Sequence, residues 1–202
     1  TKGKTTGATV KAEIDLAARS LLRLGGEYQH YTLNDWWPAS GTGGMSPYTF
    51  ININDGQRNR LALFGEWEKQ FTPQWTTQLG VRYERVNTRT GQVHGYNQNS
   101  NPTSAGMSMM NQTNDAARFN TSAKRDSTDN NWDFTALAHY KIDATQDIEF
   151  GLARKVRSPN LYERYSWSTA NMMAIMNNFV GDGNGYIGNP DLKPEKAHTV
   201  SA

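Results

Sequence analysis

The chain has 202 residues, no cysteine and a formal net charge of +2, and its mean hydropathy is −0.76. So small a charge gives no reason to expect a nucleic-acid partner. The absence of cysteine excludes disulfides and zinc–thiolate sites within these residues. No run of 18 apolar residues occurs, which excludes a transmembrane helix.

The first strand-like segments span residues 8–18 and 21–33. In the first of them, Val10, Ala12 and Ile14 alternate with charged residues, and a period of two predicts an extended strand. A helix over 10–24 is the alternative, because Ala, Leu, Glu and Arg also favour helix. The hairpin context favours two strands.

Alternation is clearest in the segments 58–70 and 75–88. Leu61 and Leu63 fall on one face of the first of these segments, and Arg60 falls on the other. Each segment is therefore predicted to be a strand with one apolar and one hydrophilic face.

The same pattern returns at 131–142 and 146–157, and a seventh strand is expected to begin near Glu195. Short connections lie near Ala17–Ser20, Phe71–Gln74 and Asp143–Gln146, and long ones run over 34–57, 88–130 and 158–194. Short and long connections alternate strictly, so all the short turns fall at one end.

This organisation predicts an all-β protein, an antiparallel transmembrane β-barrel of which these residues form about six to seven strands. Its apolar face would contact outer-membrane lipid, and its hydrophilic face would line an enclosed aqueous lumen. The alternative is a soluble or surface-exposed β-rich binding module that uses its Trp and Tyr side chains.

Aromatic residues near the expected strand ends fit the interfacial belts of such a barrel. The Trp36–Trp37 pair is assigned to a belt, with a buried aromatic corner as the alternative. The other belt residues are Trp67, Trp75, Tyr83, Trp132 and Tyr140.

Charged side chains on the hydrophilic face are expected to form lumenal ion pairs. The carboxylates are Glu66, Glu68 and Glu84, and the cations are Arg60 and Arg82. No Gly-x-Ser-x-Gly, His-Glu-x-x-His or P-loop motif occurs, so we expect no enzyme. A barrel lipase or protease would need a Ser/His or Asp/His group at its rim, and none is evident.

The most specific pattern reads ARKVRSPNLYERY and, after a loop, IGNPDLKPEKAH. It closely resembles the barrel of TonB-dependent outer-membrane receptors. The residues that carry the resemblance are Arg157, Pro159, Leu161, Tyr162 and Glu163, then Gly188, Asn189, Pro190, Leu192, Pro194 and Glu195. Because a proline cannot donate to a ladder, strand pairing is expected to start only beyond Pro194.

The resemblance implies a barrel of about 22 strands in the outer membrane of a Gram-negative bacterium. It also implies an amino-terminal plug and energy passed on by TonB. Residues 1–202 would be part of the barrel domain, without the plug and the carboxy-terminal strands. No signal segment opens the chain and Thr1 is not a start methionine, so we expect an internal piece of a longer receptor.

Seven methionines are present, all outside the expected strands. Met45 lies in the first long connection. The others are Met107, Met109 and Met110 in the second, and Met172, Met173 and Met176 in the third. Thioether sulfur is a soft ligand that selects Cu(I), and imidazole is a natural companion, so His94 could join such a site.

The Asp35–Pro38 stretch and these methionines resemble the copper-receptor branch of the family, which implies that copper, as ion or complex, is the transported ligand. No resident cofactor is expected. Packing is the competing role for both groups of methionines. In the third connection, Met172, Met173, Met176, Phe179 and Val180 could form one apolar face of a short helix.

The rival ligand is an iron–siderophore, which aromatic and arginine side chains would bind in an outer vestibule. The candidate residues are Tyr162, Arg164, Tyr165, Trp167 and Tyr186. The same side chains could instead only make the loop rigid.

Overall fold

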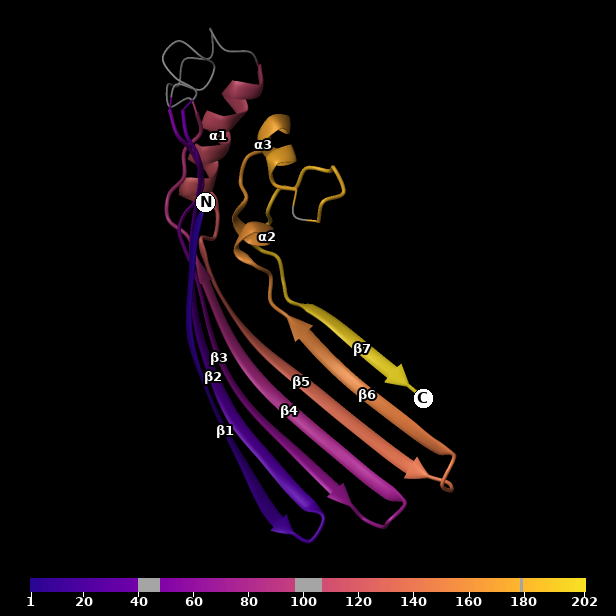
Figure 1. Cartoon of the computed structure of the whole chain (residues 1–202). Coiled ribbons are helices and arrows are strands. Elements are labelled where there is room, and N and C mark those ends of the chain that lie inside the picture. The colour runs from indigo at the N-terminus through magenta and orange to yellow at the C-terminus, as the bar shows by residue number, and fades with distance from the viewer. Residues whose placement is uncertain (40–47, 97–106, 179) are drawn as a thin grey trace.

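The computed structural model describes residues 1–39, 48–96, 107–178 and 180–202. Within them, one antiparallel sheet of seven strands follows the sequence order (Figure 1). The strands are β1 (Lys2–Ala17), β2 (Ser20–Trp37), β3 (Phe50–Gln70), β4 (Trp75–Arg89), β5 (Asp126–Lys141), β6 (Asp147–Arg157) and β7 (Glu195–Ser201). The described helices are α1 (Met107–Ser122), α2 (Leu161–Tyr165) and α3 (Asn171–Met176). The predicted all-β antiparallel architecture is confirmed.

The helical alternative for residues 10–24 is wrong. Val10 pairs with Gly26 and Ile14 pairs with Leu22 in the ladder between β1 and β2. Ladder pairing outweighs the modest helix propensity of this segment.

The strands extend further than their alternation predicts. Residues 34–57 were expected to form a loop, but β2 continues to Trp37 and β3 begins at Phe50. In this extension Trp36 pairs with Ile51 and Trp37 pairs with Phe50, and the register shifts on either side of Asp35. These shifts interrupt the two-residue periodicity while the backbone pairing continues.

One face of the sheet, here called the apolar face, exposes large aliphatic and aromatic side chains. Leu63 in β3 is 58% exposed and Leu152 in β6 is 59% exposed. The opposite face, here called the charged face, carries arginines and glutamates of the sheet, among them Arg60, Arg82, Glu66 and Glu84. The predicted division between the faces is present in every described hairpin.

Two rows of aromatic rings border the apolar face. Trp75 packs on Tyr140 with ring centroids 5.6 Å apart, and Tyr83 packs on Trp132 at 4.9 Å. The two rows are eight residues apart in each strand, which is about 26 Å along the strand. At a strand tilt of about 40°, this corresponds to about 20 Å along the membrane normal. This spacing fits the apolar band of a transmembrane barrel.

The assignment of Trp36 and Trp37 to a belt is corrected by the register. Tyr28 pairs with Leu61, close to the upper aromatic row, whereas Trp37 pairs with Phe50 far beyond it. Trp37 packs on Phe50 with centroids 4.8 Å apart, so the buried aromatic corner describes it better.

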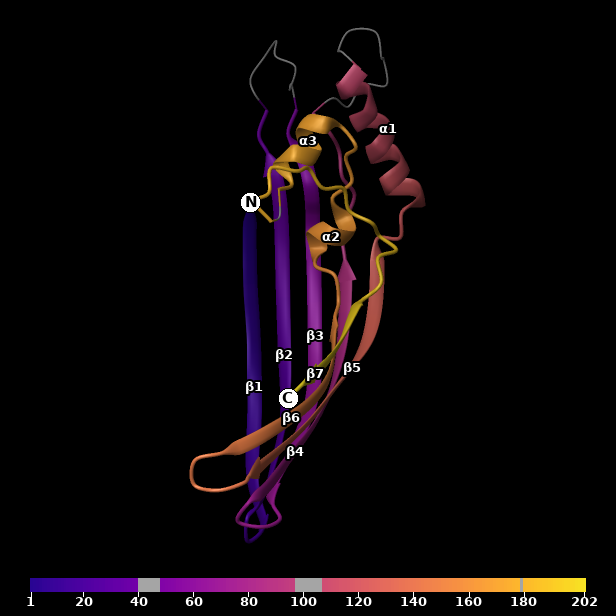
Figure 2. The same ribbon diagram turned by 90° about the vertical axis from the view of Figure 1, so that its right-hand side faces the viewer.

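The three helices all lie at one end of the sheet, opposite the short turns (Figures 1 and 2). We call these the loop end and the turn end. The sheet is curved, and α2 and α3 lie on its concave side (Figure 2). No helix in the described ranges is long and apolar enough to cross a bilayer.

Candidate functional site: the loop assembly and the charged face

The connection between β6 and β7 is fastened to the strand ends by Arg157. Its guanidinium donates to both carboxylate oxygens of Glu163, at 2.9 and 3.0 Å, and to Glu195 at 3.0 Å. Asn160 caps α2 with a capping box that also uses Glu163. The motif therefore joins the end of β6, the helix α2 and the start of β7.

Gly188 allows the returning chain to pass directly over α2. A Cβ at this position would lie 2.7 Å from the backbone nitrogen of Ser166, and backbone cannot yield as a side chain can. The Gly188 N–H donates to the Ser166 carbonyl at 2.6 Å, and the Asn189 N–H donates to the Glu163 carbonyl at 2.9 Å. β7 begins at Glu195, directly after Pro194, as predicted.

Arg164 joins this loop to the charged face. Only 1% of its surface is exposed, and its Nη2 lies 2.9 Å from an oxygen of Asp129 in β5. It also donates to Thr88 in β4 at 2.9 Å and to the Leu192 carbonyl at 3.0 Å. A buried arginine with this many partners positions the loop.

A hydrophobic cluster lies at the loop end and unites all three loops. Phe50 is fully buried and stacks on Trp167 with centroids 4.9 Å apart. The other buried members are Leu33, Ile53, Val93, Ala116, Phe119, Leu161, Tyr165, Ala170 and Met173. The loops therefore form one packed assembly on the strand ends.

A buried polar group lies beside this cluster. The Asn52 side-chain amide donates to Asp35 at 2.8 Å and to the side-chain Oδ1 of Asn177 at 2.9 Å. Asp35 also accepts a hydrogen bond from the Thr1 hydroxyl. This group joins β2 and β3 to the segment after α3, and the alternation of the strands gave no sign of it.

The helix α1 lies within the connection 88–130, which was expected to be a polar loop. Its buried residues Gln112, Asp115, Ala116 and Phe119 follow the helical spacing i, i+3, i+4 and i+7. That spacing is visible in the sequence, but polar neighbours dilute it. Asp115 accepts from the Thr169 N–H at 2.7 Å, which ties α1 to the chain before α3.

The methionines proposed as metal ligands divide between α1 and α3. The first turn of α1 contains Met107, Met109 and Met110, and α3 contains Met172. The side chains of these four methionines fall outside the described residues, as do Met45 and Phe179. Met173 is 3% exposed and packs in the cluster, whereas Met176 is 46% exposed. The expected single apolar face is wrong: Val180 is also exposed, so only Met173 among the described members is buried.

His94 forms an isolated bridge with Ile51, whose N–H donates to the His94 carbonyl at 2.8 Å. Its ring Nδ1 lies 3.3 Å from the Gly95 carbonyl oxygen. In the described part of the chain, no three His, Asp or Glu side chains gather as a metal site.

The side chains proposed for siderophore binding serve mainly to build the loop assembly. Arg164, Tyr165 and Trp167 are buried, and Tyr162 and Tyr186 are only partly exposed. Burial raises the pKa of the Tyr162 phenol, and the neighbouring Asp35 raises it further. Arg164, Tyr165 and Trp167 therefore make the loop rigid, which was the alternative to ligand binding.

A hollow of about 360 Å³ lies between α1 and the chain that follows α2. Acidic and basic groups share its lining, which includes Asp115, Arg118, Lys124 and Asp191. Among the described residues, its lining holds no methionine or histidine.

The charged face below the loops is a ladder of ion pairs. Arg23 binds Glu66 at 2.6 Å and Glu68 at 3.0 Å. A second group joins Arg82 to Glu27 at 2.6 Å, and Glu84 accepts from both Arg60 and Arg82. The predicted pairing of these acids with arginines is confirmed, although Arg23 was not foreseen as the partner of Glu66 and Glu68.

These features define a class of protein: an antiparallel barrel wall with lipid on one side, an ion-paired interior on the other, and a structured loop assembly at one mouth. A family model described as TonB-dependent receptor-like, β-barrel, matches residues 2–202. The chain belongs to this family. Searches of curated proteins and of solved structures found no match.

Membership of the family makes this chain part of a transporter and not of an enzyme. It implies an outer-membrane location in a Gram-negative bacterium, a TonB partner and a transported ligand. The loop end then faces the outside of the cell and the turn end faces the periplasm. The charged face is the lumenal wall, over which α2 lies.

Proposed function

We propose that this chain belongs to a TonB-dependent transporter that imports copper, as the ion or as a complex, into the periplasm. The observation that carries the proposal is that two methionine-bearing segments from different loops belong to one packed assembly at the barrel mouth.

The assembly joins α1 to α3 directly. Ala116 and Phe119 of α1 share the hydrophobic cluster with Met173 of α3, and Asp115 binds the backbone just before α3. The first turn of α1 and the exposed side of α3 therefore belong to the same structured mouth.

Soft sulfur ligands favour Cu(I) over hard cations. Within α3, Met176 is exposed and suits this role, whereas the buried Met173 is a packing residue. We therefore assign the copper contacts to Met107, Met109, Met110, Met172 and Met176, with His94 as a candidate imidazole ligand.

The iron–siderophore alternative is weakened by burial. Such a ligand needs accessible arginine and aromatic groups, yet Arg164, Tyr165 and Trp167 are buried in contacts with the sheet. Copper remains the better supported ligand.

The test uses the receptor purified at full length from outer membranes. One variant replaces Met107, Met109 and Met110 with leucine, a second replaces Met172 and Met176, and the matched control is Met173→Leu. We expect each multiple variant to bind Cu(I) about tenfold more weakly in competition with a colorimetric chelator. The control is expected to bind as the unmodified receptor does.

Copper accumulation in cells that carry each variant provides the transport readout, and it should follow the binding order. A receptor that binds no copper in either oxidation state but binds a ferric siderophore would overturn the proposal. Equal copper affinity in all variants would show that the assigned methionines do not bind copper.

A further inference from the structure

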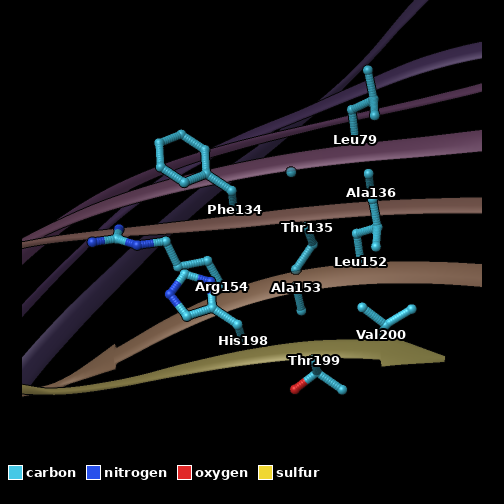
Figure 3. Close-up of a pocket in the computed structure, with 11 residues that line it drawn as sticks. Leu79, Phe134, Thr135, Ala136, Leu152, Ala153, Arg154, His198, Thr199 and Val200 are labelled. Atoms are coloured by element: carbon cyan, nitrogen blue, oxygen red, sulfur yellow. The ribbon is translucent and has the colours of Figure 1, made fainter.

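A hollow of about 450 Å³ opens on the apolar face across β4 to β7 (Figure 3). Its floor follows one row of the ladder, in which Leu79 pairs with Ala136, Ala136 with Leu152, and Leu152 with Val200. Ala136 is the short member between two leucines, so its methyl group leaves the depression. In a barrel this hollow faces the lipid.

Two basic side chains lie at the loop end of the hollow. Arg154 and His198 are ladder partners in the next row, and both line the hollow beside Phe134 (Figure 3). Arg154 donates to the Trp132 carbonyl, so its guanidinium reaches toward the upper aromatic row. Lys196 precedes His198 by two residues in β7, so it lies on the same face and nearer the loop end.

Within the described part of β6 and β7, no acidic residue shares a face with Arg154, His198 and Lys196. The described residues of β6 and β7 that share this face are Ile148, Phe150, Leu152, Arg154, Val156, Lys196, His198 and Val200. The acids Glu149 and Glu195 fall on the opposite, charged face, where Glu195 binds Arg157. Among the described residues, the Arg154 guanidinium donates to the carbonyl of Trp132 and forms no ion pair.

A cation facing lipid is costly at mid-membrane and becomes tolerable near the interface, where phosphates lie. The upper aromatic row marks that interface on the outer side. An arginine and a histidine side by side offer charge-assisted hydrogen bonds to phosphate oxygens, and the hollow directly below offers apolar contact.

We propose that this patch is a binding site for an acylated, phosphate-bearing lipid of the outer leaflet. The phosphate binds Arg154 and His198, and one acyl chain lies in the hollow along Leu79, Ala136 and Leu152. The proposal rests on membership of the barrel family and is independent of copper transport.

Binding is measured on the full-length receptor in detergent by native mass spectrometry, with lipid A as the probe and dephosphorylated lipid A as its neutral counterpart. We expect lipid A to bind about tenfold more tightly than the neutral form. The double variant Arg154→Gln/His198→Gln should lose this preference. The matched control is Lys155→Gln, one residue along β6 but on the charged face, and it should keep the preference.

A second variant, Ala136→Leu, fills the hollow. It should weaken the binding of both lipids while the receptor keeps its heat-modifiable mobility on a gel. Unchanged lipid A binding in the double variant would overturn the proposal. So would displacement of lipid A by inorganic phosphate at equal concentration, because that result would assign the site to a free anion.

Discussion

Glu84 is the residue on which two arginines of the lumenal wall converge. Its Oε2 lies 2.5 Å from Arg60 Nη2 and 3.4 Å from Arg82 Nη2, and only 12% of its side chain is exposed. Removal of its charge would leave Arg60 without an acidic partner among the described residues.

We therefore expect Glu84→Gln to destabilise the barrel by about 1–3 kcal/mol. The matched control is Glu13→Gln, whose carboxylate is largely exposed and lies 3.5 Å from Arg23; we expect less than about 0.5 kcal/mol for it. Denaturant unfolding of the receptor in detergent measures both. Equal effects would show that the ladder of ion pairs is energetically uniform.

At the scale of single residues, the sequence predicts which face a strand residue occupies but not its partner. Glu66 and Glu68 were assigned correctly to the charged face because alternation determines the face. Their partner Arg23 lies in another hairpin, and its position depends on register that alternation does not encode. Asp129 and Arg164 are also distant in the chain, 35 positions apart, and nothing local connects them.

Among the larger elements, the β6–β7 connection depends on one buried ion pair. Arg164→Ala would leave Asp129 nearly buried without its cation, and breaking such a pair costs about 3–5 kcal/mol. We expect the loop to leave the sheet and become sensitive to protease, while the strands remain assembled.

Limited proteolysis followed by mass spectrometry locates the cuts, which should fall within 158–194. Arg118→Ala is the control, because Arg118 is mostly exposed and pairs with Asp115 in its own helix. Cuts at other places, or none, would contradict the role of Arg164 as the anchor.

The same loop should loosen in acid. Burial alone would raise the pKa of Glu163, but hydrogen bonds from Arg157 and the Asn160 N–H outweigh it, so the pKa lies below its ordinary value. The stabilising contribution of Glu163 is therefore fully present above about pH 4.3, the unfolded value. It is lost as the pH falls through the lower folded pKa.

Hydrogen exchange of α2 amides between pH 7 and pH 3, corrected for the intrinsic rate, should show this loss of protection. In Glu163→Gln we expect weaker protection at pH 7 and a flatter dependence below pH 4. Asp191→Asn, an exposed change on the same connection, should behave as the unmodified receptor does. A flat profile in the unmodified receptor would contradict the prediction.

Element boundaries were predicted well at the turn end and poorly at the loop end. The turn near Phe71–Gln74 lies where an apolar strand pattern stops, so the pattern marks it. At the loop end, β2 and β3 continue as a ribbon whose register shifts on either side of Asp35, and no periodicity signals where pairing stops. The helix α1 was missed for a related reason, since a polar segment folds there against a cluster supplied by other loops.

On the scale of the whole molecule, the membrane position of the sheet is testable with one pair of neighbours. Leu79 is halfway between Trp75 and Tyr83 on the apolar face, while Gln78 lies on the charged face. An arginine at the lipid midplane costs about 2–4 kcal/mol, and one in a hydrated lumen costs little.

We accordingly expect Leu79→Arg to destabilise the receptor in lipid vesicles by that amount and Gln78→Arg to leave it nearly unchanged. Denaturant titration followed by tryptophan fluorescence measures both. Equal destabilisation would mean that the two faces are not separated by a membrane.

The overall architecture was predictable because a two-residue period, strict alternation of short and long connections, and the motif around Arg157 and Pro194 agree with one another. The ligand was not. Methionine in a polar loop is compatible with packing and with metal binding, and the structure separates these roles only for Met173, which is buried, and Met176, which is exposed.

The ribbon formed by β2 and β3 determines how far the protein stands out from the cell. From Tyr28, near the upper aromatic row, to Trp37 are nine residues, about 30 Å along the strand. A rigid projection of this length carries the neighbourhood of Pro38 and Tyr48 through the sugar layer that surrounds an outer-membrane protein. An epitope tag inserted there would be open to antibodies on intact cells, whereas one inserted at Thr72 would be hidden until the cells are broken.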